Sequence, residues 1–241
     1  MTADHIVKAF DQDLKRVDAI IAEMGGLAEA QFAAAIEAML RRDVEQAERI
    51  IAADERIDAL EQELDRDVIK MIALRQPMAD DLRMLVAALR IGGAIERIGD
   101  YARNIAKRTL ALAQAPSVAP AETVARLGRL VLEMLRNALD AYLSRDIARA
   151  HDVRRSDQDA DAMYTGLFRE LLTYMMEDPR NITACTHLLF AAKNVERIGD
   201  HVTTIAENVI YLVSGAAPES KRPPNAEFAE GMASASKPAP R

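Results

Sequence analysis

Apolar residues recur at spacings of three and four along most of the chain. Because a helical turn takes 3.6 residues, this spacing places them on one face of a helix. After Pro120 the apolar stripe comprises Val124, Leu127, Leu130, Val131, Met134, Leu135, Ala138, Leu139 and Tyr142. The same pattern predicts helices over residues 6–41, 43–75, 78–113, 146–177 and 180–214. With no convincing period-two alternation, the sequence predicts an all-α fold of six long helices.

Prolines and a change of composition mark the boundaries between these helices. Gln76-Pro77 and Asp178-Pro179 each place a proline where a helix begins, and the aspartate can also cap its helix. The segment 114–120 contains two prolines and divides the chain nearly in half. From residue 216 the composition shifts to Pro, Ala, Ser and Lys, which is typical of a disordered tail.

The two halves of the chain are diverged copies of one unit. Glu96-Arg97-Ile98-Gly99-Asp100 recurs 100 residues later as Glu196-Arg197-Ile198-Gly199-Asp200. Upstream matches at offsets of 102 or 103 residues are Arg42-Asp43 with Arg145-Asp146, Asp54 with Asp157, Asp58 with Asp161 and Pro77 with Pro179. Such matches in register indicate an internal duplication, and three long helices joined by short turns form a bundle. We expect a first three-helix repeat at 1–113, a linker at 114–120, a second repeat at 121–215 and a tail at 216–241.

Composition and charge limit the kinds of protein that this chain can be. Apolar residues make up 50% of the sequence and aromatic residues only 4%, as in long helices. The formal net charge of −7 opposes binding to nucleic acid. The first ten residues lack the layout of a signal peptide, and no uninterrupted apolar run approaches the length that spans a bilayer. We therefore expect a cytoplasmic protein without direct membrane insertion.

The repeated five-residue motif carries a pair of carboxylates. Glu96 and Asp100 are four residues apart and project from one face of a helix. Each copy has a second such pair one helix earlier, and the two pairs can converge in an antiparallel hairpin. Four carboxylates suit a hard cation. The candidate metal ligands are Asp54, Asp58, Glu96, Asp100, Asp157, Asp161, Glu196 and Asp200.

Several features have a simpler explanation. Glu61 with Asp65 has the same spacing as the repeated pairs but no counterpart in the other copy, and is interpreted as solvated surface. Gly99 and Gly199 each cost a helix about 1 kcal/mol relative to Ala. Either a neighbouring helix packs closely against them, or they leave room for a metal or oxyanion.

Motifs for catalysis are missing from the sequence. None of the four histidines has the helical spacing to Glu or to another His that di-iron and zinc sites use, and there is no glycine-rich phosphate loop. No catalytic residue is predicted, and metal ions are the only cofactors expected.

The motifs together resemble the PhoU family. The resemblance rests on Asp54-x-x-x-Asp58, on Gln76-Pro77 followed by Asp81-Leu82-Arg83, and on Glu-Arg-Ile-Gly-Asp in both halves, and it covers about residues 6–214. It implies two three-helix bundles related by a pseudo-twofold. It also implies that the acidic motifs bind clusters of iron, or of other divalent or trivalent metal ions such as Mn, Mg or Zn. One departure is that Asn104 follows the family pattern whereas Thr204 replaces it, so the two metal sites need not be equivalent.

The resemblance also implies a function. Members of this family act as negative regulators of phosphate uptake and of the phosphate-starvation response. They couple a phosphate ABC transporter, through its ATPase subunit, to a membrane sensor histidine kinase by protein–protein contacts. The residues alone leave two alternatives: a carboxylate-cluster metalloenzyme acting on phosphate esters, and a purely structural helical adaptor. The oligomeric state stays open, with a homodimer among the options.

Overall fold

The structure, a computed structural model, describes the backbone of residues 3–216 and the side chains of residues 12–216. Its elements are α1 (Ala3–Arg41), α2 (Val44–Ala53), α3 (Glu55–Arg75), α4 (Asp80–Leu112), α5 (Pro120–Ser144), α6 (Ile147–Glu177), the short 3-10 helix η1 (Pro179–Asn181) and α7 (Ile182–Ser214). These residues contain no strand, so the all-α prediction is confirmed. Of the predicted tail, only Ala216 lies within the described range.

The first helix of each repeat ends in the same turn. Arg42 and Arg145 have positive φ angles of 58° and 56°, which stop α1 and α5. The next residue caps the following helix, since the Asp43 carboxylate accepts the N–H of Gln46 at 2.9 Å. Asp146 does the same for the N–H of Arg149 at 3.1 Å. The repeated Arg-Asp pair is therefore a repeated helix stop and start.

Several helix boundaries differ from the sequence prediction, among them the start of α1 at Ala3 and not at residue 6, and three differences have a local cause. α4 begins at Asp80 and not at residue 78, because Ala79 has a positive φ of 47°. α7 begins at Ile182, because the residues after Asp178 first form η1; Asp178 accepts the N–H of Arg180 at 2.9 Å, as its capping role predicts. The helix predicted over 43–75 is interrupted at Asp54, which separates α2 from α3.

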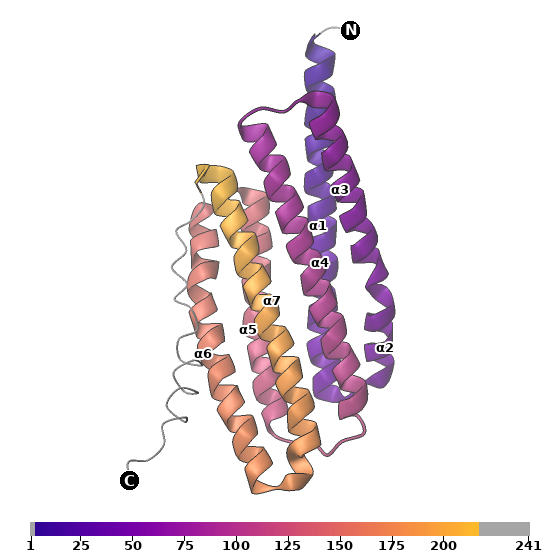
Figure 1. The fold of residues 1–241 in the computed structure, drawn as a ribbon, viewed down its shortest axis with the longest axis vertical. Helices are drawn as coiled ribbons and strands as arrows, with labels where there is room; N and C mark the ends of the chain where they lie inside the picture. The colour runs from indigo at the N-terminus through magenta and orange to yellow at the C-terminus, as the bar shows by residue number, and fades with distance from the viewer. Residues whose placement is uncertain (1–2, 217–241) are drawn as a thin grey trace, which may run out of the picture.

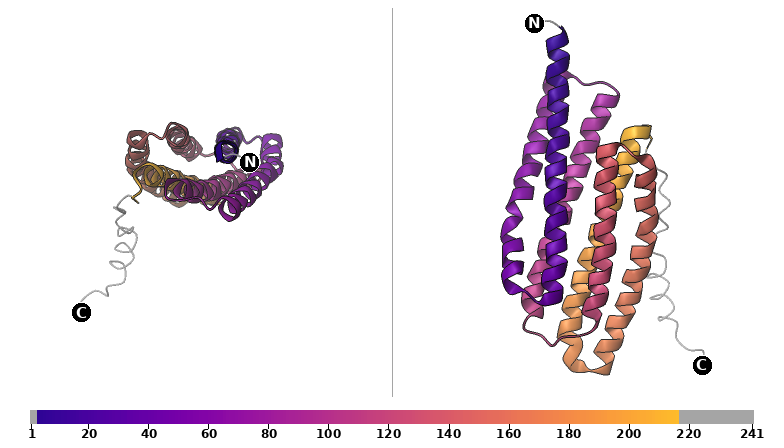
Figure 2. Two further views of the ribbon diagram at one scale, coloured as in Figure 1. Left: turned by 90° about the horizontal axis from the view of Figure 1, so that it is seen from above. Right: turned by 180° about the vertical axis from the view of Figure 1, so that it is seen from behind.

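The helices form two three-helix bundles that lie side by side along the long axis (Figure 1). The third helices of the repeats, α4 and α7, run antiparallel at the centre and make the most extensive contact between any two helices. α1 and α5 lie together on one side of this pair, and α2–α3 and α6 flank it (Figure 2). Tyr101 and His201, at equivalent positions, stack with their ring centroids 5.7 Å apart. This contact places the pseudo-twofold axis between them.

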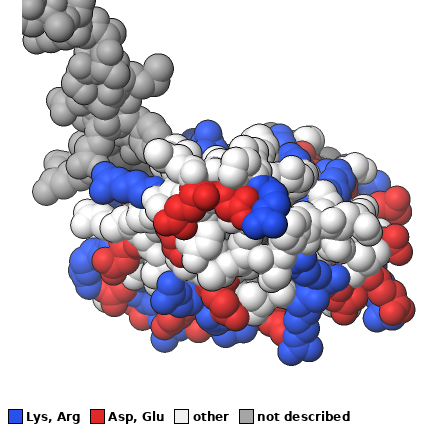
Figure 3. All heavy atoms as spheres, turned by 90° about the horizontal axis from the view of Figure 1, so that it is seen from below, with Lys and Arg blue, Asp and Glu red and all other residues white. Residues whose placement is uncertain are grey.

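α1 is long and apolar enough, over Gln12–Arg41, to cross a membrane by length and composition. Half of its most apolar window is buried inside the bundle, where Val17, Ile21 and Met24 are fully enclosed. Burial against α4 and α5 accounts for the apolar face of this helix. At the end of the molecule seen in Figure 3, acidic and basic side chains are interspersed among uncharged ones.

Candidate functional site

The first carboxylate cluster lies where α4 packs against the interruption between α2 and α3. Asp54 sits at this interruption and is only 2% exposed. Its carboxylate accepts a hydrogen bond from Gln31 Nε2 at 3.0 Å and pairs with the Arg103 guanidinium. The second terminal nitrogen of Arg103 lies 2.6 Å from Asp100 Oδ1. One guanidinium therefore joins the two acidic motifs of the first repeat.

The outer carboxylates of this cluster repel one another. Burial raises the pKa of Asp58, and the negative charges of Asp54 and Asp100 raise it further. Burial likewise raises the pKa of Glu96, with the charge of Asp100 as the next cause. The structure thus brings the four predicted residues of the first repeat into one electrostatically coupled group.

Glu61 also belongs to this coupled group, although its spacing had been interpreted as solvated surface. Burial raises its pKa, and the charges of Asp65 and Asp58 add to the effect. Glu61 in turn raises the pKa of Glu96 on the facing helix. Its position three residues after Asp58, on the same helical face, is the signal that could have identified it.

The second cluster combines α6 with α7. Glu196 Oε2 is 2.6 Å from Lys193 Nζ, and Asp200 Oδ2 is 3.6 Å from Arg197 Nη1. Asp157 faces α7 beside Gly199, where an added Cβ would lie 3.9 Å from Asp157 Oδ1. Each of the other three acids has an interaction partner: Asp157, Asp161 and Asp200. The α6–α7 pair is thus the counterpart of the α3–α4 pair.

The residues around the acidic motifs differ between the repeats. Three first-repeat residues are replaced at equivalent positions of the second: Gln31 by Met134, Ile57 by Ala160 and Arg103 by Thr203. The Thr203 hydroxyl is buried and has no hydrogen-bond partner.

Space beside the repeated glycines differs as well. A Cβ added to Gly99 would lie 3.0 Å from Ile57 Cδ1 and 3.2 Å from Asp54 Oδ1. A Cβ added to Gly199 would meet nothing closer than 3.8 Å. Close helix packing therefore explains Gly99, whereas a Cβ at Gly199 would make only ordinary van der Waals contacts.

Both clusters, as placed, are neutralised by side-chain cations. As placed, no three Asp, Glu, His or Cys side chains within the described range come close enough together to hold one. In the first cluster Arg103 already supplies the positive charge, so a metal does not fit while it is there. In the second cluster Lys193 lies against Glu196 and Arg197 lies against Asp200, so positive charge is supplied there as well.

A basic groove lies between the C-terminal half of α4 and the N-terminal half of α7. It encloses about 440 Å³ and is lined by Asn104, Lys107, Arg108, Ala111, His187, Phe190, Lys193 and Asn194. The Arg108 guanidinium lies 4.6 Å from the ring centroid of Phe190, whose side chain is 48% exposed. Among the described residues, no acidic side chain forms an ion pair with Lys107 or Arg108.

The two halves of the α4–α7 face differ in charge, although Arg90 lies over the Tyr211 ring in the half opposite the groove. At the positions related by the repeat, Glu207 replaces Lys107, Asn208 replaces Arg108 and Gly93 replaces Lys193. Sequence analysis missed this groove because its residues come from two helices far apart along the chain. The sequence did contain one signal of the groove: at these positions the residues of the two repeats do not match.

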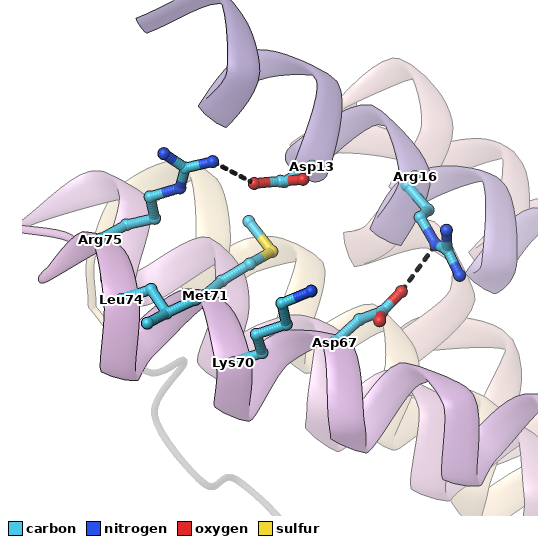
Figure 4. Close-up of a pocket in the computed structure, with 7 residues that line it drawn as sticks. All are labelled: Asp13, Arg16, Asp67, Lys70, Met71, Leu74 and Arg75. Carbon is cyan, nitrogen blue, oxygen red and sulfur yellow. Dashed lines mark hydrogen bonds and ion pairs between the residues drawn. The ribbon is translucent and has the colours of Figure 1, made fainter. Parts of the chain in front are cut away.

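A smaller cavity of about 150 Å³ lies between α1 and α3 (Figure 4). Arg16 Nε is 2.7 Å from Asp67 Oδ2, and Arg75 Nη2 is 3.2 Å from Asp13 Oδ2. Because these ion pairs cross the cavity and join the two helices, we interpret it as a structural contact.

Comparison with known proteins gives the same organisation. The family model described as the PhoU domain matches twice, at residues 21–109 and 124–209. The phosphate-specific transport system accessory protein PhoU homolog of Xylella fastidiosa (strain 9a5c) is 54% identical over 211 residues, covering 88% of this chain and 89% of that protein. The homolog from Caulobacter vibrioides (strain NA1000 / CB15N) is 49% identical and covers 91% of this chain and 96% of its own.

Solved structures share the fold. The crystal structure of PhoU from Pseudomonas aeruginosa superposes with a TM-score of 0.84 at 37% identity, over 86% of this chain and all of that one. The phosphate transport system regulatory protein PhoU from Streptococcus pneumoniae gives a TM-score of 0.80 at 27% identity, over 87% and 99% of the chains. With two copies of the family domain and close relatives aligned over nearly their full length, this chain belongs to the PhoU family.

Proposed function

We propose that this protein is a negative regulator of phosphate uptake and of the phosphate-starvation response. It works in the cytoplasm by binding and not by catalysis, and it couples a phosphate ABC transporter to a sensor histidine kinase through protein–protein contacts. Family membership supports this role, because the relatives are named as accessory proteins of a phosphate-specific transport system.

The observation that carries the docking role is the unequal α4–α7 face. One half has the basic groove with an exposed aromatic ring, and the other has Glu207 in place of Lys107. Two related surfaces of unlike charge can select two unlike partners, since charge complementarity steers association and rejects wrong partners. We propose that the ATPase subunit and the kinase each use one half.

Metal ions are the proposed cofactors of the carboxylate clusters, with iron first and Mn, Mg or Zn as alternatives. When bound, a metal would neutralise the clustered charges and hold two facing helices together. The donor set is all-carboxylate, so it selects hard cations without fixing their identity.

The alternative functions have weaker support. A metalloenzyme needs an open coordination position for water, and in the first cluster the Arg103 guanidinium occupies the space between the acids. A purely structural adaptor explains this ion-pair network. It does not explain why Lys107 and Arg108 line the groove without forming an ion pair with any described acid.

Gene deletion tests the regulatory role. We expect a phosphate-starvation reporter to stay on in phosphate-rich medium after deletion, and the wild-type gene to switch it off. Complementation with Lys107→Glu/Arg108→Glu should fail while the variant protein accumulates normally, and Arg126→Glu/Arg129→Glu, at exposed positions of α5 outside the groove, is the matched charge-change control that should still complement. A reporter that stays off in the deletion strain, together with metal-dependent phosphatase activity of the purified protein, would favour the metalloenzyme.

A further inference from the structure

Building on the docking role proposed for the basic groove, we propose that the groove between α4 and α7 also binds a nucleoside diphosphate. The two phosphates contact Lys107, Arg108 and Lys193, and the base stacks on Phe190. A bound nucleotide covers the cations that a docking partner needs and thereby controls docking. Only this last consequence rests on the proposed function.

The groove contains positive charge that the protein itself does not balance. Among the described residues, no acidic side chain forms an ion pair with Lys107 or Arg108, although the whole chain carries a formal net charge of −7. On the α7 wall, Lys193 Nζ lies 2.6 Å from Glu196 Oε2, so its charge is already matched in part. Two unmatched cations in a concave site attract a multiply charged anion, and phosphate accepts hydrogen bonds from both ammonium and guanidinium groups.

The same groove presents an aromatic surface for a base. The Phe190 side chain is 48% exposed, and the Arg108 guanidinium lies 4.6 Å from its ring centroid. Aromatic rings and arginine side chains are the groups on which bases stack in proteins that bind single-stranded nucleic acid. An inorganic anion would make no use of the exposed ring, so Phe190 favours a ligand that carries a base as well as phosphate.

Neutral polar groups on both walls can bind the base edge or the ribose. Asn104 lines the groove from α4 and Asn194 from α7. Asn194 Nδ2 donates to the Phe190 carbonyl oxygen at 2.9 Å, which leaves its Oδ1 as an acceptor. His187 Nδ1 is buried and has no hydrogen-bond partner. These side chains supply the donors and acceptors that a base and ribose hydroxyls pair with.

Size and charge favour a diphosphate. The groove encloses about 440 Å³, within the roughly 300–1,000 Å³ of sites that hold small organic ligands. Phe190 and Lys193 are three residues apart and lie on successive turns of α7, so one ligand can reach both with its base and its phosphates. A third phosphate would bring more negative charge against Glu196, which already lies beside Lys193.

The binding experiment uses full-length protein and ADP as the probe. Fluorescence anisotropy follows ADP that carries a methylanthraniloyl label, with a chelator present so that metal ions at the acidic motifs cannot hold the phosphates. We expect saturable binding that unlabelled ADP reverses. Adenosine and inorganic phosphate should each compete at least tenfold less well, because each makes only part of the contacts.

Variants of the groove test where the nucleotide binds. Lys107→Gln/Arg108→Gln should weaken ADP binding at least tenfold, since it removes both unmatched charges. Phe190→Leu keeps an apolar side chain but removes the ring, so it should weaken ADP binding about tenfold and leave the inhibition constant of inorganic phosphate unchanged. Arg126→Gln/Arg129→Gln, at exposed positions of α5 outside the groove, is the matched control and should bind ADP as the wild type does.

Three results would overturn the nucleotide site. They are the absence of saturable ADP binding by wild type at millimolar concentration, equal competition by inorganic phosphate and ADP, and undiminished ADP binding by Lys107→Gln/Arg108→Gln that is folded by circular dichroism. The docking role fails separately: if Lys107→Glu/Arg108→Glu restores control of the phosphate-starvation reporter, the groove is not a docking surface, while ADP binding by the wild type still establishes the nucleotide site.

Discussion

Beside the motif of the first repeat lie an amide, an isoleucine and a guanidinium, whereas the same positions of the second repeat hold Met134, Ala160 and Thr203. The motif itself is identical in both. In the first repeat Arg103 joins the motif to the buried Asp54, whereas in the second the motif acids lie against Lys193 and Arg197 of their own helix. The Thr203 hydroxyl, at the position of Arg103, has no hydrogen-bond partner. A shared acidic motif therefore fixes where carboxylates lie, and the residues around it fix what neutralises them.

The largest expected effect comes from removing the internal cation. In metal-free protein, Arg103→Ala should lower the free energy of unfolding by roughly 2–3 kcal/mol, somewhat less than the 3–5 kcal/mol of a fully buried pair, because Arg103 is 29% exposed. Thr203→Ala should instead raise it by about 0.5–1 kcal/mol, because it removes a buried hydroxyl without a partner and alanine favours the helix. Urea unfolding followed by circular dichroism measures both. Equal losses at the two positions would show that the guanidinium does not stabilise the first cluster.

The glycines give an effect of intermediate size. Gly199→Ala should stabilise the protein by about 1 kcal/mol, because alanine favours the helix and its methyl group meets only ordinary contacts. At Gly99 the methyl group would press on Ile57 and Asp54, so this gain should be cancelled or reversed. Paired urea titrations of the two variants check the difference. Identical gains would mean that the two helix contacts are equally loose.

Removing the charge of Glu96 and removing that of Glu196 should change the free energy of unfolding in opposite directions. In metal-free protein at neutral pH, Glu96→Gln should raise the free energy of unfolding by about 0.2–0.5 kcal/mol, since it removes the repulsion with Asp100 four residues on. Glu196→Gln should lower it by about 0.2–1 kcal/mol, since it removes the pair with Lys193.

The pH dependence of the Glu96→Gln gain has a defined sign. Because burial and Asp100 raise the pKa of Glu96, the folded state holds this proton more tightly than the unfolded chain does. The ionised form therefore destabilises the fold, and the gain is full above the raised pKa and vanishes below the ordinary value of 4.5. Urea titrations between neutral pH and pH 4 measure it. A gain that persists at the acidic end would have a cause other than charge.

Much of the fold was predictable because it depends on local pattern. The apolar stripes, the Arg-Asp turns and the duplication all lie within short stretches of sequence, and the structure confirms the helices that they predict. The interruption at Asp54 was not predictable, because the helical pattern continues through it. Its cause is tertiary: a buried carboxylate is held by Gln31 from α1 and Arg103 from α4.

The candidate site was predictable only in part, for the same physical reason. Spacing of four residues showed which acids share a helix face, and in the structure the charges of the first-repeat acids raise the pKa values of Asp58 and Glu96 in addition to burial. Spacing could not show that Arg103 reaches across to Asp54, nor that Lys107 and Lys193 line one groove. Those contacts depend on how α4 packs against α2–α3 and α7.

The smallest expected effect lies on the axis that relates the two repeats, where Tyr101 and His201 occupy equivalent positions and stack on each other. Burial lowers the pKa of His201 below its usual 6.5; Asp200 opposes this shift, and Arg97 and Arg197 add to it. The folded state therefore binds this proton less tightly than the unfolded chain does. The free energy of unfolding is highest above pH 6.5 and falls as the pH drops through 6.5 towards the lowered pKa.

In metal-free protein, His201→Phe keeps a ring for the stack and should remove this small loss of stability at low pH, whereas Tyr101→Phe should retain it. Urea titrations from pH 8 to pH 5, together with the imidazole titration followed by nuclear magnetic resonance, measure the difference. An imidazole that titrates at or above 6.5 would contradict the burial of His201 between the two repeats and, with it, this placement of the axis.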